Sequence, residues 1–126
     1  MSVRIHPSAI VDPGACLGHD IEIGPFAIIG PNVTIGDSCR IHARVTLERN
    51  VRLGRDVSVG IGSILGGEPQ DLKFGGEETV VEVGDGTRIR EYATINRGTS
   101  ASGSTRLGAN CFIMSYVHLA HDCHVG

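Results

Sequence analysis

Aliphatic residues recur at every sixth position over the first half of the chain. The large side chains of this row are Ile5, Val11, Leu17, Ile23, Ile29, Ile35, Ile41, Leu47, Leu53, Val59 and Leu65. A small or β-branched residue stands two positions before most of them, as at Ala9, Ala15, Ala27, Val33, Cys39, Val45, Val51, Val57 and Ser63. Six is not a helical period, whereas in a strand alternate side chains share one face. The pattern predicts short strands with two inward rows, one of large and one of small side chains.

Glycine directly follows many of the large aliphatic residues. These glycines are Gly18, Gly24, Gly30, Gly36, Gly54, Gly60 and Gly66. A six-residue repeat buries its apolar face only when copies stack, as short strands joined by tight turns. We expect the glycines to adopt positive φ angles at these turns. With three repeats per coil, the sequence predicts an all-β parallel β-helix of about six coils, roughly 30 Å long at about 4.8 Å per coil.

Two interruptions of the period predict two inserted loops. The aliphatic row resumes at Val83, Ile89, Ile95, Leu107, Ile113, Leu119 and Val125. Asp71 and Glu77 occupy aliphatic positions within GEPQDLKFGGEET, which predicts a loop over about residues 67–80. Ala101 marks a second, shorter loop over about residues 99–104. Because both loops interrupt one continuous repeat, we expect residues 1–126 to form a single domain.

Composition and charge narrow the class of protein. The 126 residues are 40% hydrophobic and contain no tryptophan, so the core must be aliphatic. A net charge of −3, with both signs interspersed, predicts no binding of nucleic acid. The start MSVRIHPSAIVDPG has no apolar signal segment and no run approaches a membrane span, so we expect a cytoplasmic protein. The four cysteines form no CxxC pair and are expected to be reduced and mostly buried.

The stretch VHLAHDCHVG concentrates chemistry-bearing residues at the end of the chain. His118, His121 and His124 stand three residues apart, beside Asp122 and Cys123. A metal site, a proton-transfer site and a histidine-rich surface are the three alternatives. A structural zinc site normally needs four converging ligands. In the repeat, Cys123 falls in the small inward row, whereas His118 and His124 precede inward residues and should point outward from different faces, so we predict no metal.

The pattern of an aliphatic residue followed by glycine resembles the left-handed β-helix of the hexapeptide acyltransferases. That resemblance implies the left hand and a homotrimer with active sites between subunits. The segments IGPFAIIGPNVTIG, GGEPQDLKFGGEETVVEVGDGTRIREYATINRGT and HLAHDC resemble, more narrowly, the UDP-N-acetylglucosamine O-acyltransferase family. The narrower resemblance covers essentially the whole chain. It implies transfer of an (R)-3-hydroxyacyl group from acyl carrier protein to the 3-hydroxyl of UDP-N-acetylglucosamine in lipid A synthesis, without a further cofactor.

The same resemblance assigns the catalytic residues. His121 matches the general base, which the chemistry needs because a sugar hydroxyl is a poor nucleophile at neutral pH. Asp122 matches the carboxylate that orients this base and stabilises its imidazolium. In the repeat, His121 lies two residues after Leu119, where we expect the coil to turn a corner beside a neighbouring subunit.

Substrate-binding residues are assigned in the same way. His118 matches a substrate-contacting histidine, and the inserted loop supplies Gln70 and Asp71 at positions that hydrogen-bond the sugar. Lys73 matches a position that meets substrate charge, as a diphosphate requires. Asn96 stands where better-known members carry histidine before the same Arg-Gly-Thr. Asparagine cannot change charge near neutral pH, so the base assignment is unaffected, but the acceptor could carry an amine in place of the hydroxyl.

Members of this family continue for several more coils and end in a helical domain that these 126 residues lack. We therefore expect either a fragment or an oligomer that covers the last coil. Two alternative functions stay open: a catalytically incomplete trimeric scaffold or binding module, and another hexapeptide acyltransferase. The latter could be the N-acyltransferase that acts later in the same pathway or an acetyl-CoA-dependent enzyme. The gamma-class carbonic anhydrases hold zinc on the same fold, but their histidine pair is spaced five residues apart, unlike the spacing here.

Overall fold

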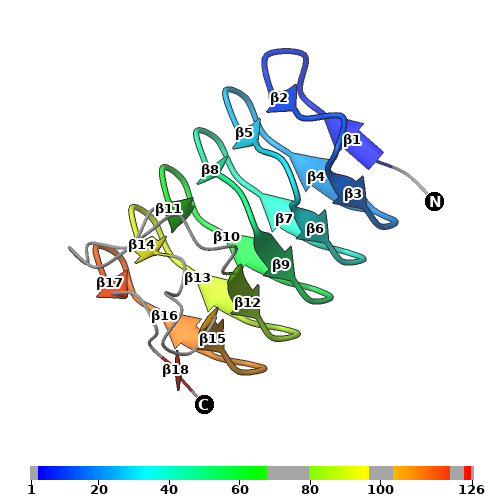
Figure 1. Ribbon diagram of the computed structural model, residues 1–126. Coiled ribbons are helices and arrows are strands. Elements are labelled where there is room, and N and C mark those ends of the chain that lie inside the picture. Colours follow the sequence, from blue (N-terminus) through cyan, green and yellow to red (C-terminus); the bar gives the residue numbers. More distant parts are fainter. Residues whose placement is uncertain (1–2, 68–79, 97–103, 120–123, 126) are drawn as a thin grey trace, which may run out of the picture.

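The chain folds as a stack of coils. The computed structural model describes residues 3–67, 80–96, 104–119 and 124–125. These residues form eighteen short strands in three parallel sheets, and the chain visits the three sheets in turn (Figure 1). Strand β1 lies at one end of the stack and β18 at the other. None of the described segments is a helix that could span a membrane.

Each sheet takes one strand from every coil. Sheet A consists of β1 (Val3–Ile5), β4 (Ile21–Ile23), β7 (Arg40–Ile41), β10 (Ser58–Val59), β13 (Arg88–Ile89) and β16 (Phe112–Ile113). Sheet B consists of β2 (Ile10–Val11), β5 (Ile28–Ile29), β8 (Thr46–Leu47), β11 (Ile64–Gly67), β14 (Thr94–Asn96) and β17 (His118–Leu119). Sheet C consists of β3 (Cys16–Leu17), β6 (Thr34–Ile35), β9 (Val51–Leu53), β12 (Val80–Val83), β15 (Ser104–Leu107) and β18 (His124–Val125). The six-coil parallel β-helix predicted from the repeat is confirmed.

Both predicted rows of side chains form the core. The buried large row is Ile23, Ile29, Ile35, Ile41, Leu47, Leu53, Val59, Leu65, Val83, Ile89, Ile95, Leu107 and Ile113. Most of the second row is smaller, and its buried apolar members are Ile21, Ala27, Val33, Cys39, Val45, Val51, Val57, Val81 and Ala93. Burying one large aliphatic side chain stabilises the fold by about 1.5–3 kcal/mol. The repeat therefore supplies one continuous aliphatic core from Ile21 to Ile113, whereas Ile5 in the first strand is 41% exposed because no earlier coil covers it.

The glycine after each aliphatic residue has a different role from the predicted one. Of the seven repeat glycines only Gly66 has a positive φ, so the prediction is wrong for the other six. The left-handed conformation falls two residues later, for example at Asn32 and Asn50, a residue type that tolerates it. The glycines are needed because successive coils approach closely. A Cβ on Gly30 would overlap the carbonyl oxygen of Glu48, and a Cβ on Gly60 would lie 2.6 Å from the carbonyl carbon of Arg90.

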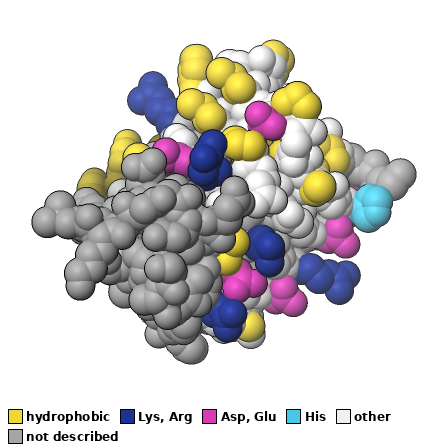
Figure 2. Space-filling model, in the orientation of Figure 1, with side chains coloured by type: hydrophobic (Ala, Val, Ile, Leu, Met, Phe, Trp, Pro, Cys, Tyr) yellow, Lys and Arg dark blue, Asp and Glu magenta, His cyan; other side chains and the backbone are white. Residues whose placement is uncertain are grey.

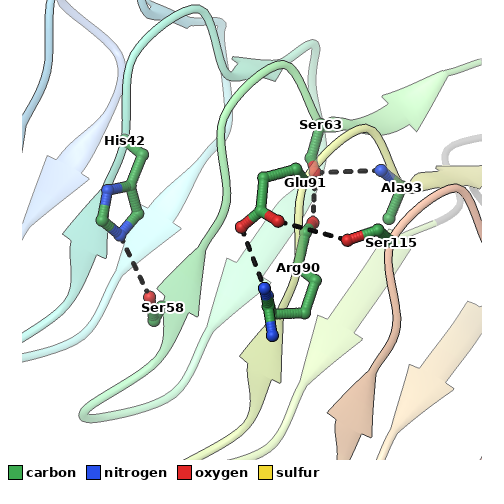
Figure 3. A network of polar contacts seen from close by, with 7 residues as sticks. All are labelled: His42, Ser58, Ser63, Arg90, Glu91, Ala93 and Ser115. Carbon is green, nitrogen blue, oxygen red and sulfur yellow. Dashed lines mark hydrogen bonds and ion pairs between the residues drawn. The ribbon is translucent and has the colours of Figure 1, made fainter.

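Hydroxyl groups in the small row bridge neighbouring coils. The Ser63 hydroxyl donates to the carbonyl oxygen of Arg90 at 2.9 Å and accepts from the N–H of Ala93 at 3.1 Å (Figure 3). Thr87 donates to the carbonyl oxygen of Gly108 at 2.7 Å in the same way. A buried hydroxyl left unpaired would cost about 1–3 kcal/mol. These hydrogen bonds explain why polar residues are accepted in an otherwise aliphatic core.

The described cysteines are free thiols in three different environments. Cys39 is buried, Cys111 is partly buried and Cys16 is exposed on the outer face of sheet C. Burial raises the pKa of the Cys39 thiol, so this residue stays protonated as part of the core. The expectation of mostly buried cysteines therefore holds for Cys39 and is wrong for Cys16. Cys123 is outside the described residues.

Candidate functional site at the edge between sheets B and C

The predicted site segments all connect sheet B to sheet C. The first loop joins β11 to β12, the second joins β14 to β15, and the segment with His121 joins β17 to β18. These strands are neighbours: Gly67 pairs with Asn96 in sheet B, and Leu107 pairs with Val125 in sheet C. The three connections therefore leave and re-enter the same edge of the prism in consecutive coils. We call this the B–C edge, defined by the ends of β11, β14 and β17 and the starts of β12, β15 and β18.

Five predicted site residues fall within these connections. Gln70, Asp71 and Lys73 belong to the first, and His121 and Asp122 belong to the third. All five are outside the described residues, so their roles stay predictions. The fold nevertheless determines that the segments carrying them start from β11 and β17, the two strands that flank β14 in sheet B.

The boundaries of the expected loops are only partly described. Gly67 closes β11, Val80 opens β12 and Ser104 opens β15, so these end residues belong to strands. The remaining parts of the ranges 67–80 and 99–104 are not among the described residues.

Asn96 and His124 are described through their backbones. Asn96 is the last residue of β14, directly at the B–C edge. His124 opens β18 in sheet C and pairs with Arg106, whereas His118 lies in sheet B, as the repeat predicts. Within the described ranges no three histidine, cysteine or acidic residues could hold a metal ion together. Because His121, Asp122 and Cys123 are not in those ranges, the absence of a metal stays a prediction.

His118 is the predicted site residue whose side chain the structure describes. It is exposed on the outer face of sheet B, which confirms the predicted outward orientation. Its Nδ1 atom lies 2.7 Å from the Oγ1 atom of Thr94, its register partner on β14. Within the described part of the chain, the other ring nitrogen, Nε2, has no hydrogen-bond partner. With respect to the described residues, Nε2 is therefore available to a ligand at the B–C edge.

The outer face of sheet B changes character along the stack. Its outward row runs through Ile10, Ile28, Thr46, Ile64, Thr94 and His118. The isoleucines are 64%, 43% and 39% exposed in that order. Exposed apolar side chains in one row are typical of a surface that another molecule covers. The polar end of this row, Thr94 and His118, adjoins the B–C edge.

The other two faces are charged in both signs. On sheet C, Glu82 lies between Arg52 and Arg106, with nitrogen–oxygen distances of 4.0 and 3.0 Å. On sheet A, Arg88 pairs with Asp56 at 3.5 Å. Figure 2 shows acidic and basic side chains close to one another on the described surface. Both faces therefore carry ion pairs between acidic and basic side chains.

Thr94 was not among the residues predicted from the sequence. Partners in the early coils are 18 residues apart, as for Asn32 and Asn50. Thr94 and His118 are 24 residues apart because the second insertion adds six residues to the coil. Counting back one coil and allowing for this insertion would have identified Thr94 as the neighbour of His118.

Known proteins resemble the chain both in sequence and in structure. Residues 2–37 match the family described as bacterial transferase hexapeptide (six repeats). The acyl-[acyl-carrier-protein]–UDP-N-acetylglucosamine O-acyltransferase of Stenotrophomonas maltophilia (strain R551-3) is 49% identical over 124 residues, which are 98% of this chain and 47% of that protein. The crystal structure of UDP-N-acetylglucosamine O-acyltransferase from Moraxella catarrhalis RH4 matches with a TM-score of 0.94 and 42% identity, over 97% of this chain and 48% of that chain.

A different kind of sugar acyltransferase is much less similar. The GDP-perosamine N-acetyltransferase of Caulobacter crescentus matches with a TM-score of 0.55 and 25% identity, over 93% of this chain and 50% of that chain. The all-β, left-handed parallel β-helix predicted from the resemblance is confirmed. The chain spans about half the length of the curated relatives that it matches. By its similarity along nearly its whole length, the chain belongs to the UDP-N-acetylglucosamine O-acyltransferase family of hexapeptide-repeat proteins.

Proposed function

We propose that this chain contributes to the transfer of an (R)-3-hydroxyacyl group from acyl carrier protein to the 3-hydroxyl of UDP-N-acetylglucosamine, in lipid A synthesis. The observation that carries the proposal is that both connections with predicted site residues start from the B–C edge, beside Asn96 and the exposed ring of His118. The names of the relatives support the choice of donor and acceptor. The low similarity to the N-acetyltransferase disfavours an acetyl-CoA-dependent enzyme.

His121 is the general base of the proposed reaction. It accepts the proton of the sugar 3-hydroxyl while that oxygen attacks the thioester carbonyl carbon. The carbon–sulfur bond breaks as the ester bond forms, and the proton passes from His121 to the departing sulfur. Asp122 orients the His121 ring and stabilises its imidazolium form.

The acceptor is bound by groups around the same edge. Gln70 and Asp71 hydrogen-bond the sugar, and Lys73 meets the charge of the diphosphate. Asn96 lies at the end of β14 on this edge, where an uncharged amide contacts the sugar or its nucleotide. His118 presents Nε2 to the acceptor. No metal and no cofactor other than the carrier protein takes part.

The active assembly is proposed to be a homotrimer. Support comes from the exposed isoleucines on sheet B, which water would otherwise surround. A second subunit on this face would also adjoin His118, because both lie in one outward row. A cytoplasmic location stays a prediction.

A transfer assay on the purified 126-residue chain tests the proposal. With (R)-3-hydroxyacyl carrier protein and UDP-N-acetylglucosamine, we expect His121→Ala to lose about 10²–10⁴-fold in rate. His42→Ala is the matched control, because His42 is an exposed histidine near sheet A, and it should retain wild-type turnover. The wild-type rate should rise with pH through a histidine pKa of about 6.5, because the base must be neutral. Chelators should leave the rate unchanged.

A non-enzymatic trimeric scaffold is the second candidate, because the aliphatic core and the exposed isoleucines of sheet B would stabilise a folded trimer without any catalytic residue. A folded trimer without turnover, measured by its mass in solution and the same assay, would favour the scaffold. Turnover that is unchanged in His121→Ala would remove this residue as the base.

A further inference from the structure

We infer that Thr94 is a positioning residue for His118, which it holds in one tautomer by donating its hydroxyl hydrogen to Nδ1. The neutral ring then carries its hydrogen on Nε2, the nitrogen that faces away from Thr94. Nε2–H donates to an oxygen of the nucleotide-sugar acceptor. The assignment of this acceptor rests on the proposed function.

The geometry restricts the ring. The oxygen–nitrogen distance of 2.7 Å is that of a good hydrogen bond. Thr94 and His118 are direct register partners on adjacent strands, so the paired backbones fix their separation. Threonine is β-branched and has restricted χ1 freedom. One hydrogen bond from a stiff side chain therefore selects both the orientation and the protonated nitrogen of the imidazole.

The chemistry favours threonine as the donor. The acceptor substrate offers hydroxyl, carbonyl and phosphate oxygens, all of which accept hydrogen bonds, so a ring N–H suits it better than a bare nitrogen. A bare Nε2 would provide a second base, but the reaction transfers one proton and His121 already receives it. The reverse arrangement, with Nδ1–H donating to Thr94, would leave Nε2 as an acceptor.

Nitrogen NMR on the full 126-residue chain reads the tautomer directly. The histidines are labelled with ¹⁵N, and the His118 signals are assigned by their loss in His118→Gln. Spectra are recorded after a pH titration has shown that the His118 signals no longer change with pH. We expect Nε2 of wild-type His118 to carry the hydrogen and Nδ1 to accept. Thr94→Val removes the hydroxyl at nearly constant shape and should give a mixture of tautomers, whereas Thr94→Ser should retain the wild-type pattern.

Thr46→Val is the matched control. Thr46 occupies the same outward row on β8 but is not a register partner of His118, so its replacement should leave the His118 signals unchanged. A hydrogen on Nδ1 in the wild-type chain, or an unchanged pattern in Thr94→Val, would overturn the inference.

Turnover provides the second measurement. Thr94→Val should lower kcat/KM by about 3- to 10-fold, the range expected for one lost hydrogen bond, and Thr94→Ser should restore it. Equal losses in both variants would contradict positioning through the hydroxyl. Because the tautomer is read without substrate, an inactive wild-type chain would count against the proposed function and not against the hydrogen bond.

Discussion

The corner between sheets B and C differs sharply between the first three coils and the last three. In the early coils β5 passes to β6, and β8 to β9, through short turns. There the side-chain amide of Asn32 donates to Asn50 at 2.8 Å, so successive turns are bonded to each other. In the later coils the same corner carries the three connections that contain the candidate site. The aliphatic core is nevertheless continuous, since Leu47 and Leu65 are both fully buried.

The strands beside the first insertion show how the fold accommodates it. β11 and β12 have four residues each, whereas β5 and β8 have two. β12 and β15 pair over four residues, from Val80 with Ser104 to Val83 with Leu107. Longer pairing secures the base of the connection, so function can be added at an edge without a change in the core.

The largest effect is expected when residues 67–80 are replaced by Pro-Asn, copied from Pro31 and Asn32. This replacement makes the connection from β11 to β12 as short as the turn from β5 to β6. We expect turnover to fall more than about 100-fold, because Gln70, Asp71 and Lys73 are lost and each hydrogen bond to a charged group contributes about 1.5–3 kcal/mol. The strand spectrum in circular dichroism should persist, because Val81 keeps its place in the repeat. A Gly/Ser segment of the original length is the control: activity in that variant would mean that length alone matters.

Truncation of one core leucine in the early coils and one in the later coils tests whether both parts of the stack are packed equally well. Leu47→Ala and Leu65→Ala should each lower the free energy of unfolding by about 2–5 kcal/mol, since both leave a cavity in the same row. Denaturant melts provide the measurement. A much smaller loss at Leu65 would indicate that the coils with insertions are packed less tightly than the early ones.

Substitution of Gly30 tests whether glycine is needed at the short turns because successive coils approach closely. Gly30→Ala should destabilise the fold by about 1–3 kcal/mol, because the new methyl group overlaps the carbonyl oxygen of Glu48. Gly14→Ala, at the same corner of the preceding coil, should cost less, since the nearest atom is Asp12 Oδ1 at 3.1 Å, in a side chain that can move. Equal thermal unfolding midpoints for the two variants would contradict the explanation that Gly30 is needed because successive coils approach closely.

The smallest effect is expected at Glu91, in the later coils. Hydrogen bonds from Arg90 at 3.3 Å and Ser115 at 3.2 Å lower the pKa of this exposed carboxyl (Figure 3). A lowered folded-state pKa stabilises the fold above the unfolded value of about 4.3, and this stabilisation disappears as pH falls through the folded value. The thermal unfolding midpoint of Glu91→Gln should therefore be slightly lower than that of wild type at neutral pH and equal to it at low pH. Glu48→Gln is the control, and a gap that persists in acid would contradict ionisation as the cause.

The repeat was sufficient to predict the two inward rows and the coil number. It also predicted that His118 points outward and that His124 lies in another sheet. These predictions succeeded because the side chains of a strand alternate and the coils are nearly identical. The predicted positive φ of the glycines was wrong for six of the seven, because the sequence does not show how closely two backbones approach.

Contacts between the later coils could not be read from the period. Tyr92 and Tyr116 stack with ring centroids 5.7 Å apart. Arg106 reaches Glu82 across the same separation of 24 residues. Insertions of different length change the separation of register partners, from 18 residues to 24 or more. The period alone therefore does not identify these partners, because the length of each insertion must also be counted.

The sequence by itself determined the architecture, because a fixed period of aliphatic residues can bury its side chains in only one kind of stack. It also determined which segments interrupt the stack and which residue types they carry. The tertiary structure decided that both interruptions and the connection from β17 to β18 start from one edge, and that Thr94 reaches the Nδ1 atom of His118. The physical reason is that strand pairing brings residues from different coils to within hydrogen-bond distance, and such contacts have no signal in the local sequence.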